Sequence, residues 1–398
     1  MNTTRRTFLA GAAASVAVPT LHAAEAGMSV DGHVFPNWAV AQINAGVARY
    51  AAWKGSDPTV AFPVITDTHS NLVDDDRPFN WNDPKNHVYF LRKIAHLVEA
   101  DWISDLGDHD FDVSAFHPVP FAQVRPQIDA LVRRYESETK PVLFSQGNHD
   151  HSNENGRARF TTREYGATFC RGINAPHGHK FVMSDCGTWG YYDIPAKKFR
   201  AVYLNTNESD RGVIGYSVKQ LQFLADAFMS APDGWHVSVQ QHVDLPWHIG
   251  HWRRNIFHHD PENGWIFQQM LDDFANHRGT PINGWGRPPC TSYGGVTWDF
   301  SKSKALLVGG FYGHAHWENS IAIGGVNYTL LPGYGTVPRD CITGGARDPK
   351  DGGALPKDNL LIDLVAIKPE RCLVHVFRFG FTGSHSPFRE REYVYGEA

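Results

Sequence analysis

The sequence predicts an α/β fold in which strands alternate with helices and then give way to a run of strands. In the first part of the chain, short segments rich in Val, Ile and Phe alternate with segments whose apolar residues recur every three to four positions. The last part consists mainly of strand-like segments. This order is typical of an α/β core in which strands also pack against other strands.

The expected strands are short apolar runs that end at glycine or at a polar residue. They cover residues 62–66, 102–104, 140–145, 199–205, 235–239, 304–308, 326–331, 360–367 and 372–379. The expected helices carry apolar residues at helical spacing and cover residues 86–100, 121–138 and 218–228. Pro126 lies in the first turn of the second helix or kinks it, because proline lacks the N–H that a helix interior uses.

One main domain is expected over residues 57–398, with residues 27–56 as an N-terminal extension laid over the core. Residues 243–300 are rich in Trp, His, Gly and Pro and have poor strand periodicity. We interpret them as a long excursion from the core, partly helical at 262–277. Long irregular excursions in compact domains are often functional.

Residues 1–26 resemble a twin-arginine export signal. Arg5 and Arg6 precede an apolar run that ends near Val18, which is shorter than the about 20 residues needed to cross a bilayer. Ala24-Glu25-Ala26 offers a small-residue cleavage site. The resemblance implies the twin-arginine export machinery as a partner, a periplasmic or secreted location and no stable membrane anchor. An ordinary secretory signal or a retained anchor is the alternative.

The composition narrows the class of function. The net charge is −5, from 37 Lys and Arg against 42 Asp and Glu, so no nucleic acid partner is expected. The 22 histidines favour metal chemistry, although most of them are expected on the surface or in packing. The five cysteines form no Cys-x-x-Cys pair, which argues against a structural zinc site. Cys170 and Cys186 either close a short disulfide loop or, as we favour, are small buried thiols.

Five of the expected strands end in carboxylate, imidazole or amide groups. These ends carry Asp67-Thr68-His69, Gly107-Asp108, Gly147-Asn148-His149-Asp150, Gln241-His242 and Gly313-His314-Ala315-His316. The Asp-x-His and Gly-Asp fragments alone are ordinary turns or loops. Gly147-Asn148-His149-Asp150 and Gly313-His314-Ala315-His316 are more specific, and the five together in this order are more specific still. Ligands of α/β proteins bind at the carboxyl ends of the strands, so we expect the five ends to form one site.

The residue types at these ends suit metal ions. Oxygen and imidazole ligands without thiolate favour Mn, Fe or Zn over a softer metal. The number of ligands is sufficient for two divalent or mixed-valence ions. Two ions about 3.5–4 Å apart clamp the attacking and leaving oxygens of a phosphoryl displacement, and a hydroxide that bridges them is the expected nucleophile.

The ordered set resembles the motifs of the calcineurin-like metallophosphoesterase superfamily, over residues 67–316. This resemblance implies a four-layer α/β/β/α sandwich of the metallo-dependent phosphatase type. It implies one metal position formed by Asp67, His69, Asp108 and His316. It implies a second position formed by Asp108, Asn148, His242 and His314, with Asp108 shared.

The resemblance also implies two catalytic residues. His149 would steady the phosphate and protonate the leaving oxygen, and Asp150 would hold the His149 ring in the right tautomer. Phe111 stands where purple acid phosphatases have a tyrosine ligand, so an iron(III)–tyrosinate site is not expected. Ser152 and Gln241 replace an arginine and a histidine that are typical of the small bacterial cyclic-nucleotide diesterases, which weakens the case for such a substrate.

Four residues are candidates for contact with the substrate. Asn71 and His109 follow ligands closely, and Arg253 and Arg254 carry guanidinium groups that suit phosphate. A solvated basic pair is an equally good interpretation of the two arginines. The expected function is a secreted dinuclear-metal hydrolase of a small phosphate ester, and the long aromatic excursion favours a two-sided diester. A phosphomonoesterase or nucleotidase is the alternative, and a non-catalytic binding scaffold is a further one.

Overall fold

The fold is known from a computed structural model that describes most of the chain. It describes residues 28–69, 79–109, 121–150, 152–154, 157–208, 214–243, 262–279, 295–314, 318–333, 358–382 and 388–396. The other residues, among them the expected leader and most of the 243–300 excursion, lie outside this description.

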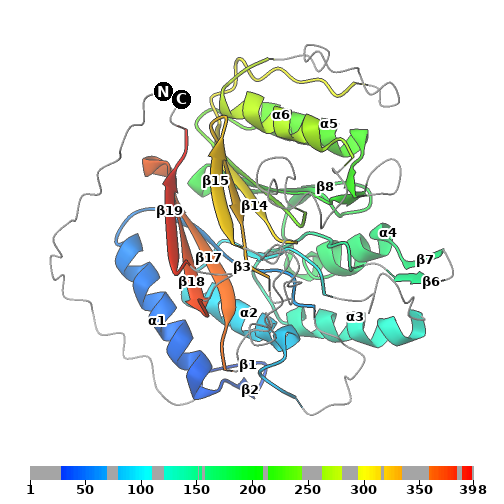
Figure 1. Cartoon of the computed structure of the whole chain (residues 1–398), viewed down its shortest axis with the longest axis vertical. Helices are drawn as coiled ribbons and strands as arrows, with labels where there is room; N and C mark the ends of the chain where they lie inside the picture. The colour runs from blue at the N-terminus through cyan, green and yellow to red at the C-terminus, as the bar shows by residue number, and fades with distance from the viewer. Residues whose placement is uncertain are drawn as a thin grey trace, which may run out of the picture.

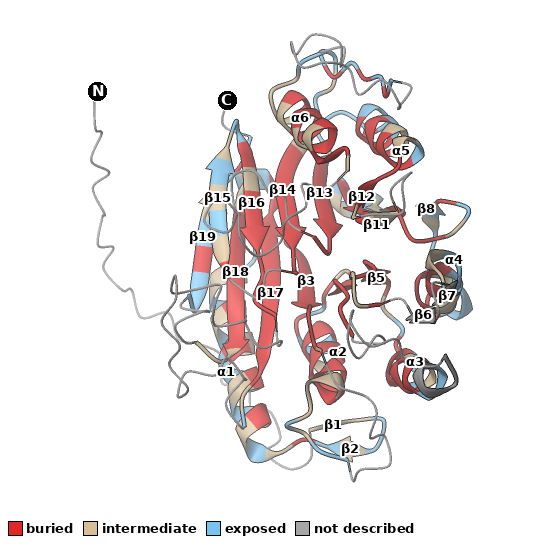
Figure 2. Cartoon of the chain, turned by 45° about the vertical axis from the view of Figure 1, so that its right-hand side comes forward, coloured by how far each residue is buried: buried red, intermediate tan, exposed pale blue. Residues whose placement is uncertain are grey.

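Two large β-sheets form the centre of the molecule. The six-stranded sheet has the order β19 (Glu390–Val394), β18 (Leu373–Gly380), β17 (Leu361–Lys368), β3 (Val60–Ile65), β4 (Ile103–Asp105), β5 (Val142–Phe144). The seven-stranded sheet has the order β15 (Asn319–Ile323), β16 (Val326–Leu330), β14 (Leu306–Tyr312), β13 (His236–Gln241), β10 (Phe199–Tyr203), β9 (Gly190–Ile194), β8 (Phe181–Met183). Their central strands are almost wholly buried (Figure 2).

Helices cover the outer face of each sheet. The core between α1 (Asn37–Lys54), α2 (His87–Leu97), α3 (Phe121–Tyr135) and the six-stranded sheet is separate from the core between α5 (Val218–Met229), α6 (Gly264–Ala275) and the seven-stranded sheet. Figure 1 shows α5 and α6 together at the top, with α2 and α3 on the lower side. The predicted α/β class is therefore confirmed.

A third core lies between the two sheets and holds them face to face. The Phe62 ring stacks on Trp102 at 4.3 Å and meets Phe311 of the other sheet edge-on at 5.4 Å. Full burial of such a side chain contributes roughly 1.5–3 kcal/mol. Because aromatic pairs prefer particular geometries, these contacts also limit how the sheets slide past each other.

Parallel pairing determines where the strand ends meet. β3, β4 and β5 are mutually parallel neighbours, and so are β10, β13, β14 and β16. The carboxyl ends of each set therefore lie along one edge of its sheet. The residues that follow β3, β4, β5, β13 and β14 are those that the sequence assigns to the metal site.

Each predicted strand and helix has a counterpart whose ends differ by a few residues. Helix α1 was not predicted, because its buried positions, Ala39, Ile43, Gly46 and Tyr50, include small residues that carry little hydrophobic signal. Gly46 lies so close to the Phe379 ring of β18 that a Cβ there would overlap it. The strands β8, β15 and β19 were also missed, since strands at the sheet edges are largely exposed.

The remaining elements are short. They are β1 (Ser29–Val30) paired with β2 (His33–Val34), β6 (Ser152–Glu154) paired with β7 (Arg157–Phe160), β11 (Asn207–Glu208) paired with β12 (Gly215–Tyr216), and α4 (Thr162–Tyr165). Cys170 and Cys186 are both free thiols, so the disulfide considered between them does not form. No helix within the described residues is long and apolar enough to span a membrane.

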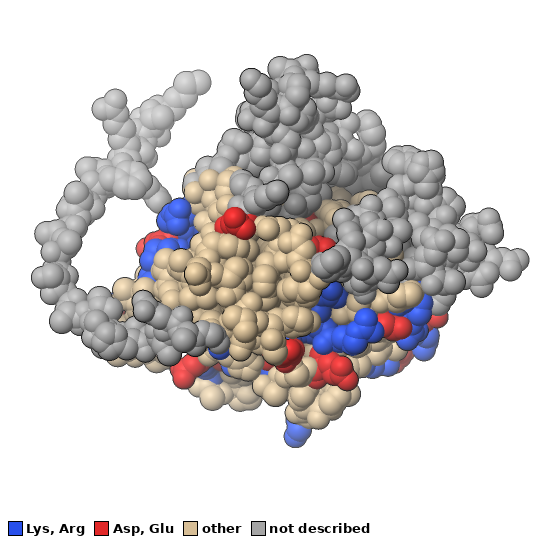
Figure 3. Space-filling model, turned by 90° about the horizontal axis from the view of Figure 1, so that it is seen from below, with Lys and Arg blue, Asp and Glu red and all other residues tan. Residues whose placement is uncertain are grey.

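The described surface carries charges of both signs. On the face seen from below, Lys and Arg side chains are interspersed with Asp and Glu side chains (Figure 3). Oppositely charged neighbours of this kind leave no extended field of one sign over those described atoms.

Candidate metal centre

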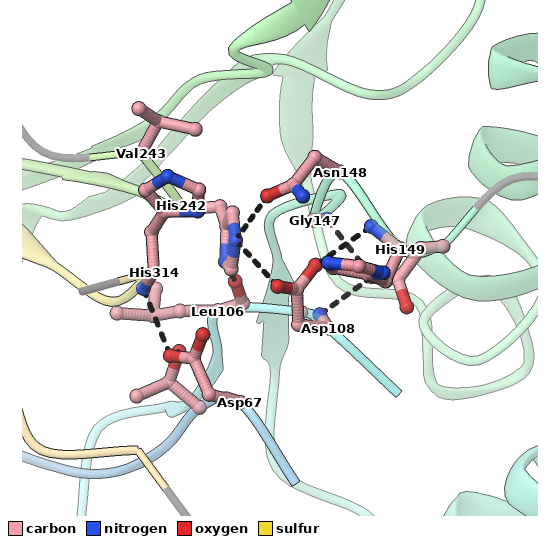
Figure 4. Close-up of polar contacts among 12 residues, drawn as sticks. Asp67, Leu106, Asp108, Gly147, Asn148, His149, His242, Val243 and His314 are labelled. Atoms are coloured by element: carbon pink, nitrogen blue, oxygen red, sulfur yellow. Dashed lines mark hydrogen bonds and ion pairs between the residues drawn. The ribbon is translucent and has the colours of Figure 1, made fainter. Parts of the chain in front are cut away.

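The ligand candidates come together where the two sheets meet at the carboxyl ends of their parallel strands. Two groups have ligand atoms that all lie within 4.8 Å of one another. They are Asp67, His69 and Asp108, and Asp108, His242 and His314. Asp108 belongs to both groups, which is the arrangement that a residue shared by two ions requires. Figure 4 shows the side chains of Asp67, Asp108, His242 and His314 converging from separate strand ends.

Four of the predicted ligands have left-handed backbone conformations. The φ angles are +52° for Asp67, +38° for His69, +60° for Asp108 and +66° for His314. A residue with a Cβ rarely adopts such angles, and each costs of order 1–3 kcal/mol. Strain of this kind persists where the surrounding structure imposes it, and it gathers at functional sites. The sequence carries no signal for this feature.

Two glycines allow the turns to approach the carboxylates closely. A Cβ added to Gly147 would overlap the backbone and carboxylate of Asp108. A Cβ added to Gly313 would overlap Thr66 and crowd Asp67. Glycine at these two positions is therefore required by close packing against the ligands.

In both Asp67 and Asp108, one carboxylate oxygen accepts hydrogen bonds from neighbouring protein groups. Oδ2 of Asp67 accepts hydrogen bonds from the Thr66 hydroxyl at 2.6 Å and from the His314 N–H at 2.8 Å. Oδ1 of Asp108 accepts from the His149 N–H at 2.8 Å. The other oxygen of Asp108, Oδ2, lies 3.1 Å from Nε2 of His242 and 3.6 Å from Nε2 of His69. These bonds orient both carboxylates before any ion binds.

The tautomer of His242 can be inferred from its partners. Nδ1 lies 2.6 Å from the Leu106 carbonyl oxygen, which only accepts, so Nδ1 carries a proton. Nε2 lies 3.1 Å from both Oδ2 of Asp108 and Oδ1 of Asn148, which are acceptors as well (Figure 4). In the neutral ring Nε2 is also an acceptor. Three acceptor atoms then face one another, and a cation is needed between them.

A proton and a metal ion both meet this need. Burial opposes charge on the imidazole, but the attraction of Asp108 outweighs it and raises the pKa of His242 to about 10. Burial likewise opposes charge on Asp108, yet His242 and His69 hold the pKa of that carboxyl well below its usual range. The same atoms are also suitable ligand atoms for a divalent ion, which would displace the proton on binding.

Asp150 has partners other than the one predicted. Its Oδ2 accepts from the N–H groups of Asp108 at 2.9 Å and Gly147 at 2.8 Å, and its Oδ1 accepts from the His109 N–H at 2.7 Å. The carboxylate thus joins the turn after β4 to the turn after β5. Shaping these turns is a different role from orienting the His149 ring.

His149 lies beside the centre, and its ring is edge-on to the His69 ring, with centroids 5.2 Å apart. His109, by contrast, corrects a prediction. Its buried ring lies 3.0 Å from Oδ1 of Asp105 and 3.3 Å from the Thr68 hydroxyl, so it faces the interior and not a substrate. His316, Asn71, Arg253 and Arg254 lie outside the described residues.

Several residues that support the site had no recognisable signal in the sequence. Thr66 fixes Asp67, the Leu106 carbonyl fixes the His242 tautomer, and Tyr135 donates to Oδ2 of Asp105 at 2.7 Å beneath His109. Thr66 and Leu106 contact predicted ligands directly, whereas Tyr135 contacts Asp105. Only the hydrogen-bond pattern distinguishes them from ordinary buried polar residues.

Comparison with known protein structures identifies the fold. No family model matches the chain, and no curated protein matches it. The structure is similar to a dimetal phosphatase from Danio rerio, with a TM-score of 0.52 and 13% identity, over 85% of this chain and 100% of that one. The chain therefore has the metallo-dependent phosphatase fold.

Two further solved structures are similar at lower scores. One is a purple acid phosphatase from yellow lupin (Lupinus luteus), with a TM-score of 0.45 and 11% identity, over 85% of this chain and 54% of that one. The other is a calcineurin-like phosphoesterase from Bacillus subtilis, with a TM-score of 0.34 and 10% identity, over 85% of this chain and 91% of that one.

Proposed function

We propose that this chain is a metal-dependent phosphoric ester hydrolase that works with two metal ions. The observation that carries the proposal is the convergence of three acceptor atoms, Nε2 of His242, Oδ2 of Asp108 and Oδ1 of Asn148, at separations that a cation would bridge. The fold, which is that of a dimetal phosphatase, supports the same conclusion.

The residues assigned to each ion follow from the two clusters. Asp67, His69 and Asp108 would hold one ion together with His316, and Asp108, Asn148, His242 and His314 would hold the other. When bound, the two ions supply the positive charge that stabilises the attacking and leaving oxygens of the phosphoryl group. The oxygen and imidazole donors suit Mn, Fe or Zn.

His149 is proposed as the residue that protonates the leaving oxygen. Its N–H bond to Oδ1 of Asp108 keeps the residue next to the shared ligand, and its half-buried ring lies against His69. An imidazole in this position can donate a proton to a leaving oxygen, as a general acid must. The Asp150 carboxylate accepts hydrogen bonds from the backbone N–H groups of Asp108, His109 and Gly147.

The proposed substrate is a small phosphate ester, with a diester favoured over a monoester. The test is hydrolysis of an aryl phosphate diester and an aryl phosphate monoester, side by side, with Mn, Fe or Zn supplied in turn. Faster diester hydrolysis supports the proposal, and faster monoester hydrolysis makes the chain a phosphatase or nucleotidase. Hydrolysis of neither ester by protein that carries two ions would leave the binding scaffold as the explanation.

We also propose that the twin-arginine machinery exports the chain to the periplasm or beyond. The support is the pair Arg5-Arg6 followed by Phe8-Leu9 and a short apolar run. The test is a reporter fused to residues 1–26, compared with the same fusion carrying Arg5→Lys and Arg6→Lys. Export of the doubly substituted fusion at the wild-type level would contradict this route.

A further inference from the structure

The end of β10 continues into a tripeptide that contacts two of the ligand-bearing turns. We propose that this tripeptide, Asn205-Thr206-Asn207, positions Asn148 and His242 relative to each other and so sets the affinity of one of the two metal positions. We call it the 205–207 bracket. The inference rests on the proposed function, because it concerns the metal position that includes Asn148 and His242.

The bracket holds the Asn148 turn through Gln146, the residue two positions before Asn148. Nδ2 of Asn205 donates to Oε1 of Gln146 at 3.0 Å, and Nδ2 of Asn207 donates to the main-chain carbonyl of Gln146 at 2.7 Å. The Gln146 and Asn205 side chains are fully buried. Because both the side chain and the main chain of Gln146 are held, the start of the turn has little freedom to shift.

The same bracket holds the strand end that carries His242. The Thr206 hydroxyl accepts a hydrogen bond from the N–H of Val243, the next residue after His242, at 3.3 Å. Oδ1 of Asn148 then lies 3.1 Å from Nε2 of His242. Three consecutive residues thus contact the neighbours of two ligands that would bind the same ion.

Helix α5 anchors the bracket itself. Oε1 of Gln220 accepts from the Asn205 N–H at 2.8 Å, and Nε2 of Gln220 donates to the Asn205 carbonyl at 2.9 Å. Gln220 lies in the first turn of α5, which Ser217 caps through the Gln220 N–H. The bracket is therefore attached to a regular element and moves little on its own.

The other metal position is held by different contacts. Asp67 bonds to Thr66 and to the His314 N–H, and the Asp67 and His69 N–H groups donate to the carbonyls of Gly107 and Asp108. None of these described contacts involves the bracket. Loss of the bracket is therefore expected to loosen the position formed by Asn148 and His242 and to spare the position formed by Asp67 and His69.

The test uses Mn²⁺ alone and the purified full chain. Thr206→Val removes the hydroxyl with little change of shape, and Asn207→Asp places an acceptor against the Gln146 carbonyl. Thr206→Ser keeps the hydroxyl and should restore wild-type binding. Asn327→Asp is the matched control, because Nδ2 of Asn327 donates to the Val394 carbonyl at 3.1 Å on an exposed part of the chain.

Calorimetric titration gives the number of Mn²⁺ ions and their affinities, and electron paramagnetic resonance distinguishes a coupled pair from a single ion. We expect two ions in the wild type. In Thr206→Val and Asn207→Asp, the ion at the position formed by Asn148 and His242 should bind roughly 10–100-fold more weakly. This is the usual effect of removing groups that orient ligands. The ion at the position formed by Asp67 and His69 should bind with the wild-type affinity.

The outcomes separate the two proposals. A wild-type chain that binds no Mn²⁺ pair overturns both the proposed function and the bracket. A wild-type chain that binds a pair, with both variants binding the pair equally well, overturns the bracket alone. Equal weakening of both ions in the folded variants also overturns it, and thermal unfolding shows whether each variant is folded. If one variant fails to fold, the other provides the same comparison.

Discussion

Oδ2 of Asp108 lies 3.1 Å from Nε2 of His242, and the two residues follow strands of different sheets. Asp108 follows β4 of the six-stranded sheet, and His242 follows β13 of the seven-stranded sheet. The site is therefore a product of the contact between the sheets, and each sheet supplies part of the ligand set. A single substitution should therefore affect the particular ion or ions that the substituted residue would bind.

Asp108→Asn should remove both metal ions, because Asp108 belongs to both ligand clusters. The amide keeps the shape of the side chain and an oxygen for the His149 N–H, but it loses the negative charge. The measurement is metal content by elemental mass spectrometry. The control is Asp129→Asn, because Asp129 is an exposed helix residue paired with Arg125. A full complement of two ions in Asp108→Asn would contradict the shared-ligand assignment.

His149→Ala should lower turnover of the favoured aryl phosphate roughly 10²–10⁴-fold while leaving metal content unchanged. The reason is that the main-chain N–H of His149, which the variant keeps, donates to Asp108. Steady-state kinetics and metal analysis check this together. His177→Ala, on a short surface turn, is the control, and loss of metal from His149→Ala would show that the ring is a ligand.

Gly147→Ala should weaken metal binding and lower the free energy of unfolding by roughly 1–3 kcal/mol, as overpacking usually does. The added Cβ would overlap Asp108, so the turn and the shared ligand must move apart. Denaturant unfolding and Mn²⁺ titration are the measurements. Gly295→Ala is the control, since a Cβ there meets no atom within 4 Å. Similar behaviour of the two variants would mean that the turn tolerates the displacement.

Stability should fall on acidification because of His87, the first residue of α2. Burial lowers the pKa of His87 from its ordinary value of 6.5 to about 4. Between these two values the unfolded chain binds the proton and the folded chain does not, so the free energy of unfolding decreases as the pH falls from 6.5 to 4. The loss contributed by His87 reaches about 3 kcal/mol at the lower end.

The measurement is the free energy of unfolding against pH for the wild type and for His87→Gln. Glutamine can still donate to the Trp81 carbonyl, which lies 2.9 Å from Nε2 of His87, but it does not titrate. The variant should have a flatter curve between pH 6.5 and 4. His236, whose pKa burial also lowers to about 4, keeps some slope in both proteins. Parallel curves would rule out His87 as a source of the acid sensitivity.

The clustering of Asp67, His69, Asp108, His242 and His314 could be predicted from the sequence because that information is local. A strand followed by glycine and a metal-binding residue is a short pattern, and parallel strands bring such patterns to one edge. The contacts of Asp150 and His109 could not be predicted from such a short sequence pattern. Both depend on the left-handed backbone at Asp108 and on which side chains the turns bring within reach. The role of Asn207 depends on contact with a turn 61 positions away.

The bond between Asp67 and His314 joins residues 247 positions apart. Neither proposed metal position can be complete until the second sheet has docked on the first, so metal binding would follow this docking. An exported chain that crosses the membrane already folded would keep the ions of the compartment where it folded. Under the proposed export route, the supply of ions at the place of folding would then decide which ions the chain carries.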